Sequence, residues 1–168
     1  MAASADARSM HRQLERALGE SKVVELRLDW LSDDREIARF LAKLAARKPR
    51  ATLIATCRRR EAGGRYRGTI AKQLFHLAEA IRAECDWYDL EIETVRKCPP
   101  ELVDALLGDG RQLRSAHFFR SMPRDLGRVA RELERGQPDA VKIAAQCDSL
   151  ADARKLLNFA AHRKDLVA

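Results

Sequence analysis

The chain has 168 residues, of which 46% are hydrophobic and 34% charged, with eight glycines and five prolines. This length suits a single domain over residues 1–168, and the composition excludes collagen-like, mucin-like and mainly disordered chains. No apolar run approaches the roughly 20 residues of a membrane-spanning helix, and the N-terminal segment lacks the apolar stretch of a secretory signal. A cytoplasmic protein that does not contact membranes is therefore expected.

The sequence alternates between short β-rich runs and longer runs with helical periodicity, and it has no low-complexity linker. Helices are expected at 9–20, 33–47, 69–84, 100–108, 124–135 and 149–162. Strands are expected at 23–29, 51–57, 87–93, 112–118 and 140–146. Five β-α units in a row predict parallel strands joined by right-handed crossovers, which is an α/β fold.

Two architectures fit this alternation. An open doubly wound sheet is complete at this length, whereas a (β/α)8 barrel typically needs about 250 residues. No glycine-rich phosphate loop follows any strand, which weakens the nucleotide-binding version of the open sheet. Periodicity alone leaves both architectures open.

The four cysteines are far apart and form no CxxC pair. They are Cys57, Cys85, Cys98 and Cys147. This spacing predicts neither a zinc site nor a disulfide framework, and it favours buried or inert thiols.

The formal net charge of +7 raises the question of nucleic-acid binding. Most of the excess arginine alternates with acids in helical segments, which is typical of solvated helix faces. The segment 58–67, RRREAGGRYR, holds five arginines against one glutamate and could bind a phosphate or a small carboxylate. Because aromatic residues make up only 5% and no RNA- or DNA-binding motif is present, a nucleic-acid-binding module is the weakest alternative.

Ionisable residues lie in the latter half of the expected strands or just after them, where a buried parallel strand should be apolar. They are Glu25, Arg27, Arg58, Glu91, His117 and Lys142. The carboxyl ends of parallel strands are where α/β proteins build their sites. We therefore expect these side chains to meet at one rim of the sheet.

Each of these residues also has a structural interpretation. His117 could be a hydrogen-bonded structural histidine, Lys142 could extend to water, and Glu25 with Arg27 could form an ion pair. Other acids are expected to be helix caps or solvated strand-end groups: Asp29, Asp89 and Glu93. The set as a whole favours a site, because burying several charges is costly unless they pair or line a polar cavity.

The residue types point to one chemistry. A lysine in apolar surroundings loses its proton more readily and can attack a carbonyl, and a histidine can move protons during and after imine formation. A carboxylate beside the histidine would fix its tautomer. Arginines and a glutamate suit an anionic, hydroxylated substrate. The sequence therefore predicts a Schiff-base lyase or aldolase acting on a small polyhydroxy keto acid.

The order of the motifs VELRLDWL, IATCR with REAGG, YDLEIE, SAHFF with MP, and DAVKIA resembles type I 3-dehydroquinate dehydratase over residues 22–160. The resemblance implies a TIM barrel of the (β/α)8 type, incomplete here with about five βα units. It also implies a shikimate-pathway lyase, likewise cytoplasmic, that converts 3-dehydroquinate to 3-dehydroshikimate and water without a metal or organic cofactor.

The resemblance assigns roles to the strand-end residues. Lys142 would form the imine, His117 would be the general acid and base, and Glu91 would orient and tune His117. The substrate hydroxyls and carboxylate would be contacted by Glu25, Arg27 and Arg58. A homodimer is implied as the assembly.

The family's first strand and its last two βα units have no counterpart in residues 1–168. Strands 23–29 and 140–146 are then expected at the two edges of the sheet, with unpaired backbone groups that favour edge-to-edge association or loose packing. An alternative function is therefore a catalytically impaired barrel remnant that acts only with a partner or as an oligomer.

Overall fold

The computed structural model describes residues 1–108, 110–163 and 166–167. Its strands form one parallel sheet in which each strand pairs with the next along the chain, in the order β1-β2-β3-β4-β5-β6. The strands are β1 (Val23–Arg27), β2 (Thr52–Thr56), β3 (Trp87–Glu91), β4 (Arg111–Phe118), β5 (Ala140–Ala145) and β6 (Leu166–Val167).

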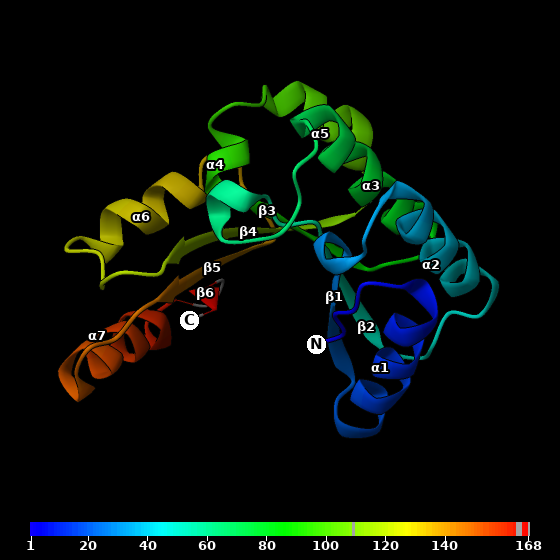
Figure 1. The fold of residues 1–168 in the computed structure, drawn as a ribbon. Helices are drawn as coiled ribbons and strands as arrows, with labels where there is room; N and C mark the ends of the chain where they lie inside the picture. The colour runs from blue at the N-terminus through cyan, green and yellow to red at the C-terminus, as the bar shows by residue number, and fades with distance from the viewer. Residues whose placement is uncertain (109, 164–165, 168) are drawn as a thin grey trace.

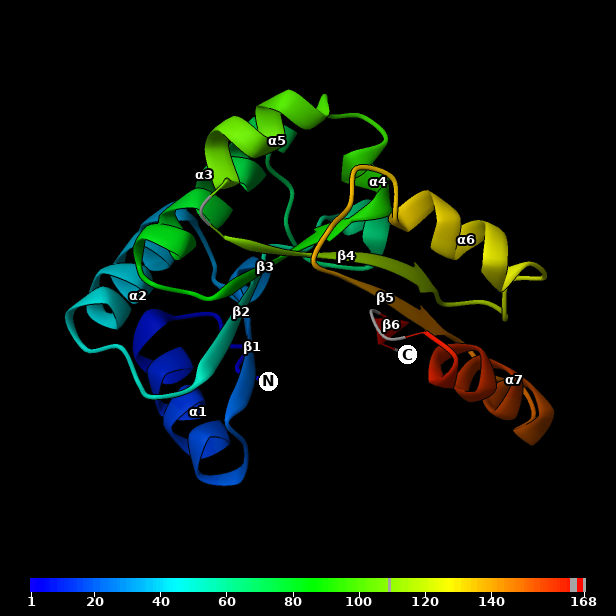
Figure 2. The ribbon, with the colours of Figure 1, turned by 180° about the vertical axis from the view of Figure 1, so that it is seen from behind.

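The helices alternate with the strands along the chain and lie in an arc around the outer, convex side of the sheet (Figure 1, Figure 2). They are α1 (Ala7–Glu20), α2 (Asp34–Ala46), α3 (Ile70–Arg82), α4 (Ile92–Val95), α5 (Pro100–Leu107), α6 (Leu126–Leu133) and α7 (Leu150–Ala161). The result is a curled half-barrel that is open between α1 and α7 (Figure 1). The strand order does not reverse, so the doubly wound alternative is excluded and the TIM-barrel type is confirmed.

Helix α2 illustrates how the sequence builds these units. The Asp33 carboxylate caps its first turn by accepting hydrogen bonds from two backbone N–H groups. One stripe of the helix is buried against the sheet, at positions i, i+3, i+4 and i+7: Ile37, Phe40, Leu41 and Leu44. The same device of a polar N-cap recurs at α1, α3, α6 and α7, with Asp6, Thr69, Asp125 and Ser149.

The predicted elements are present with boundaries within two residues of those expected, and two of the strands end early for a reason that the structure shows. Strand β1 ends at Arg27 because Leu28–Trp30 forms a short 3-10 turn. Strand β3 ends at Glu91 because Ile92–Val95 turns helical as α4. Both predicted strands are therefore two residues too long, and their last residues turn away from the sheet.

The expectation that β1 and β5 form bare edges is wrong. Ala2 bridges the outer side of β1, donating its N–H to the Glu25 carbonyl at 2.9 Å and accepting the Arg27 N–H at 3.0 Å. On the other side β6 pairs with β5, with Val141 in register with Leu166. Such one- or two-residue pairings leave no periodic signal in a sequence, so the pattern could not predict them.

The buried apolar side chains form two clusters that divide between β3 and β4. Leu90 on β3 belongs to the larger cluster, under α1, α2, α3 and α5, and Ala116 on β4 belongs to the smaller one, under α6. Within the described part of the chain no helix is long and apolar enough to cross a bilayer.

Candidate active site

The strand register brings polar side chains from β3, β4 and β5 together on the inner face of the sheet. Ser115 on β4 lies in register with Lys142 on β5 and with Glu91 on β3. Asp89 precedes Glu91 by two residues, and side chains two apart in a strand share a face. Asp89, Ser115 and Lys142 therefore converge on this face, in the middle of three neighbouring strands.

Asp89 is the centre of this cluster. Its side chain is fully buried, and its carboxylate accepts hydrogen bonds from Arg58 Nη2 at 3.0 Å, from Lys142 Nζ at 3.3 Å and from the Ser115 hydroxyl. One buried anion thus stands between two cations, one from the loop after β2 and one from β5. The pairing compensates the cost of removing these charges from water.

Arg58 and Arg27 each pair with acids. Arg58 Nη2 also lies 3.6 Å from Glu25 Oε1. Arg27 forms a two-pronged ion pair with Asp29, with both contacts at 2.8 Å. The Glu25–Arg27 ion pair, which is the alternative structural interpretation of these two residues, is not formed, because each of them has a different partner.

His117 lies on β4, two residues after Ser115, and is partly buried. Its Nδ1 is buried and has no hydrogen-bond partner among the described residues. Burial, together with the positive charges of Arg58 and Lys142, lowers the pKa of His117 to about 3, although Glu25 opposes this effect. The imidazole is therefore neutral at physiological pH.

Glu91 is the last residue of β3 and is fully buried. Its carboxylate accepts hydrogen bonds from the Arg59 N–H at 2.9 Å and from Gln73 Nε2 at 2.7 Å. Burial, and secondarily the charge of Asp89, raises the pKa of Glu91 to about 7. In the described ranges no hydrogen bond joins Glu91 to His117, so its predicted role of orienting the histidine stays a prediction.

The arginine-rich loop is fixed against the site by a glycine and an aromatic ring. Gly63 has φ +77°, and a Cβ there would lie 2.3 Å from Phe119 Cζ. Phe119 in turn stacks on His117, with ring centroids 6.0 Å apart and planes inclined by 13°. In the same loop, Arg59 donates to the Gly68 carbonyl at 2.7 Å. The loop therefore packs against Phe119, and Phe119 covers one face of the His117 ring.

Two acids that the sequence indicated as caps or solvated groups are buried members of the site. Asp89 is 0% exposed and Asp29 is 4% exposed, and both are ion-paired. A signal was available for Asp89, since it stands in the middle of the strand WYDLE rather than at its end. Ser115 could have been found by its spacing of two from His117, which places both side chains on one face.

The thiols and the possible metal ligands lie apart from one another. All four cysteines are free, as expected, and burial raises the pKa of Cys85 to about 12 and that of Cys57 well above its usual range. Across the described residues, no group of three or more His, Cys, Asp or Glu side chains could hold a metal ion.

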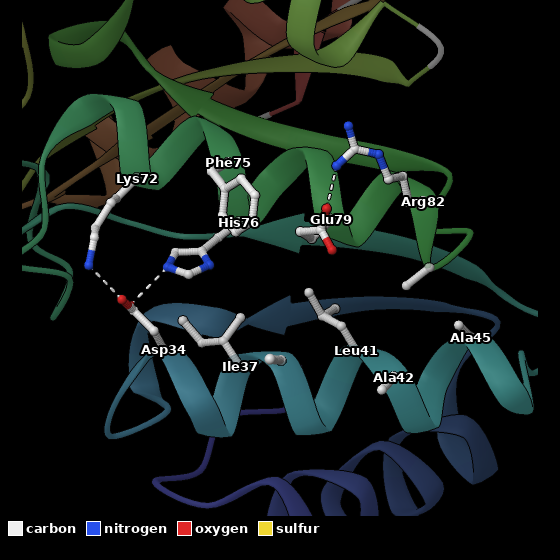
Figure 3. A pocket seen from close by; sticks show the side chains of 12 residues that line it. Asp34, Ile37, Leu41, Ala42, Ala45, Lys72, Phe75, His76, Glu79 and Arg82 are labelled. Atoms are coloured by element: carbon white, nitrogen blue, oxygen red, sulfur yellow. Dashed lines mark hydrogen bonds and ion pairs between the residues drawn. The ribbon is translucent and has the colours of Figure 1, made fainter.

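A separate groove of about 500 Å³ lies in the helix layer, between α2 and α3 (Figure 3). At one end the Asp34 carboxylate binds Lys72 Nζ at 2.7 Å and His76 Nε2 at 3.0 Å. Most of the remaining wall is apolar, and Phe75 is 54% exposed beside it. The groove belongs to the outer surface and not to the strand-end cluster.

A curled parallel sheet with helices outside and ionisable side chains at the carboxyl ends of its strands defines a barrel of the (β/α)8 class. The model of one such family, type I 3-dehydroquinase, matches residues 2–168. The chain belongs to the type I 3-dehydroquinase family.

Individual relatives agree with this assignment. The chain is 30% identical over 138 residues to the 3-dehydroquinate dehydratase of Dehalococcoides mccartyi, an alignment that covers 80% of this chain and 58% of the relative. The chain therefore spans about three fifths of that relative's length.

Two solved structures share the fold. The 3-dehydroquinate dehydratase of Geobacillus kaustophilus has a TM-score of 0.77 at 21% identity, over 96% of this chain and 66% of the other. The type I enzyme of Clostridium difficile, solved with covalently modified comenic acid, has a TM-score of 0.77 at 18% identity, over 95% of this chain and 66% of the other.

Proposed function

We propose that this chain dehydrates 3-dehydroquinate to 3-dehydroshikimate through an imine on Lys142. The observation that carries the proposal is the position of Lys142 Nζ, 3.3 Å from a buried carboxylate and on the same strand-end cluster as a neutral histidine. We infer the substrate, 3-dehydroquinate, from membership of the type I 3-dehydroquinase family. The covalently modified ligand of the Clostridium difficile enzyme is consistent with an enzyme of this family that forms a bond to its ligand.

The first step makes the substrate ketone electrophilic. Lys142 passes a proton to Asp89 or to water, and the free amine attacks the ketone carbon. The carbinolamine hydroxyl then takes up that proton and leaves as water, which gives a cationic imine. The imine nitrogen withdraws electrons from the neighbouring carbon, so the elimination requires no metal or organic cofactor.

His117 carries the protons in the second step. The neutral imidazole removes a proton from the carbon beside the imine, and the electron pair moves into an enamine. The enamine expels the hydroxyl on the next carbon, which leaves as water with the proton from His117. Hydrolysis of the conjugated imine returns 3-dehydroshikimate and the Lys142 amine.

The remaining strand-end residues bind the substrate or position the residues that bind it. Glu25 Oε1 is buried without a hydrogen-bond partner among the described residues and can accept a substrate hydroxyl. Arg27 and Arg58 supply positive charge for the substrate carboxylate. Glu91 is a positioning residue that holds the backbone N–H of Arg59, next to Arg58. We expect the protein to act on this small molecule in the cytoplasm.

A second candidate is substrate binding with little turnover unless a partner or second copy completes the site. It is favoured because both arginines already pair with protein carboxylates, Arg27 with Asp29 and Arg58 with Asp89 and Glu25. A substrate carboxylate must compete with these contacts. We expect a homodimer as the completed form.

Turnover and trapping distinguish the two candidates. Purified protein is mixed with 3-dehydroquinate while the absorbance of the enone product is followed, and sodium borohydride is added to a parallel sample. The proposal predicts product and a reduced adduct on the peptide that contains Lys142, absent from Lys142→Ala and unchanged in Lys155→Ala. An adduct without product supports the second candidate. An equal label on Lys142→Ala would refute the assignment of the imine.

A further inference from the structure

A cavity of about 250 Å³ lies on the outer side of the sheet, between the α4–α5 segment and α6. The cavity lies at the boundary between the two apolar clusters, because its wall includes Leu90 from the larger cluster and Ile92 from the smaller one. Its wall is mainly apolar and also includes arginines: Leu90, Val95, Val103, Arg96, Arg114 and Arg135. None of these residues takes part in the strand-end cluster described above.

Arg114 is the unusual member of this wall. It stands in the middle of β4 and is only 6% exposed. Its neighbours in the strand, Leu113 and Ser115, belong to the opposite face, so the Arg114 side chain projects outward into the helix layer. An apolar residue is the ordinary occupant of such a position.

The Arg114 guanidinium is held by neutral groups only. Nε donates to Gln112 Oε1 at 2.7 Å, and Nη1 donates to the backbone carbonyls of Leu133, at 3.4 Å, and Arg135. In the parts of the chain that are described, no carboxylate lies within 4.0 Å of it and Nη2 forms no hydrogen bond. Burial lowers the pKa of Arg114, although Tyr88 and the charge of Asp104 oppose this effect. The cation is therefore buried without a carboxylate in contact among the described residues, unlike Arg58 at the active site.

A purely structural role explains part of this arrangement. Nη1 satisfies carbonyl groups at the end of α6, which has a negative dipole end there. That role leaves Nη2 unused. Nη2 lies beside Gly136, 3.2 Å from the place where a Cβ would stand, so the glycine leaves space next to it.

The charge around the cavity is positive overall. Arg96 is neutralised by a two-pronged ion pair with Glu132, at 2.6 and 2.9 Å. Arg114 and Arg135 remain without carboxylate partners among the described residues, and Arg135 is exposed. A ligand with one negative charge and an apolar body would match both the cations and the apolar wall.

We propose that this cavity binds a small organic carboxylate, whose anionic group bonds to Arg114 while its apolar body contacts the wall formed by Leu90, Val95 and Val103. A cavity of this size accommodates a one-ring acid and is below the range of drug-sized pockets. The site is on the face of β4 opposite to Ser115 and His117. It is therefore independent of the proposed active site.

Calorimetric titration of the full chain with benzoate tests the proposal, with benzyl alcohol and inorganic phosphate as matched probes. Benzoate should bind saturably. Its affinity should fall at least about tenfold in Arg114→Leu, which loses a charge-assisted hydrogen bond, and by a smaller factor in Arg135→Gln. Arg16→Gln, an exposed arginine on α1, should bind as the wild type does. Arg27→Gln should also retain benzoate binding, since Arg27 belongs to the other face.

Two results would overturn the proposal. Equal benzoate affinity in wild type and Arg114→Leu would remove Arg114 from the site. Benzyl alcohol or phosphate binding as tightly as benzoate would show that the charge or the apolar body is not recognised. If Arg114→Leu does not fold, the exposed Arg135→Gln gives the decision: an unchanged benzoate affinity in that variant counts against the site.

Discussion

Lys142 Nζ lies 3.3 Å from Asp89 Oδ2, although β5 and β3, which carry these residues, are not neighbouring strands. Strand β4 lies between them and contributes the Ser115 hydroxyl, which donates to the same carboxylate. The contact is possible because side chains from alternate strands of a curled sheet lean toward one another on its concave side. Asp89 therefore sets the charge environment of the lysine from two strands away.

Replacing Asp89 with Asn should destabilise the fold and impair the site together. The change leaves Arg58 and Lys142 without their shared anion, and removal of one partner from a buried ion pair costs about 3 kcal/mol. Urea unfolding should show this decrease in the free energy of unfolding. Glu15→Gln, on the exposed side of α1, should leave it unchanged. An Asp89→Asn protein as stable as the wild type would mean that the cluster does not depend on this charge.

His117→Ala should lower kcat by at least about 100-fold, the usual scale of general acid–base catalysis. Because the pKa of His117 is lowered to about 3, the free enzyme should keep a neutral imidazole down to pH 4. The profile of kcat/KM against pH should therefore have no acidic limb near 6.5 from this residue. A limb at 6.5 that disappears in His117→Ala would contradict the lowered pKa.

Glu91 should make stability depend on pH in the opposite sense from an ordinary carboxylate. Its pKa is about 7 in the folded chain and about 4.3 when unfolded, so its stabilising effect is complete below about pH 4 and is lost as the pH rises through 7. Relative to Glu91→Gln, the wild type should lose on the order of 3 kcal/mol between pH 4 and 8.

Urea unfolding of wild type and Glu91→Gln across this range measures the effect, and the contribution of His117 cancels in the difference. The exposed Glu15→Gln substitution serves as the control, with a difference from wild type that does not vary in this way. A constant difference between wild type and Glu91→Gln would mean that the Glu91 carboxyl titrates normally.

The strands, and the site residues at one rim of the sheet, could be predicted because each is marked by a short local pattern in the sequence. Alternation and caps locate each βα unit, and a charge late in a buried strand identifies a site position such as Lys142 or His117. The ion-pair partners were not predictable in this way. Whether Arg27 pairs with Glu25 or with Asp29 depends on the backbone turning at Leu28, and the Lys142–Asp89 contact depends on the curl of three strands. Neither the turn nor the curl can be read from residue spacing.

Gly63→Ala should disturb the site through Phe119. A Cβ at this position would meet Phe119 Cζ at 2.3 Å, and the φ of +77° is strained for alanine. The ring must move, and with it the surface on which His117 stacks. We expect lower kcat and a destabilisation of about 1 kcal/mol from the backbone alone, with more from the clash.

A double-mutant cycle separates these two effects on Gly63→Ala. In the Phe119→Ala background the clash is absent, so the same glycine substitution should retain only the backbone cost, and its further effect on kcat should largely disappear. Gly19→Ala is the matched control, because a Cβ there has no heavy atom within 4 Å. Urea unfolding and kcat are measured for all variants. If Gly63→Ala lowers kcat by the same factor with and without Phe119, the loop does not act on His117 through this ring.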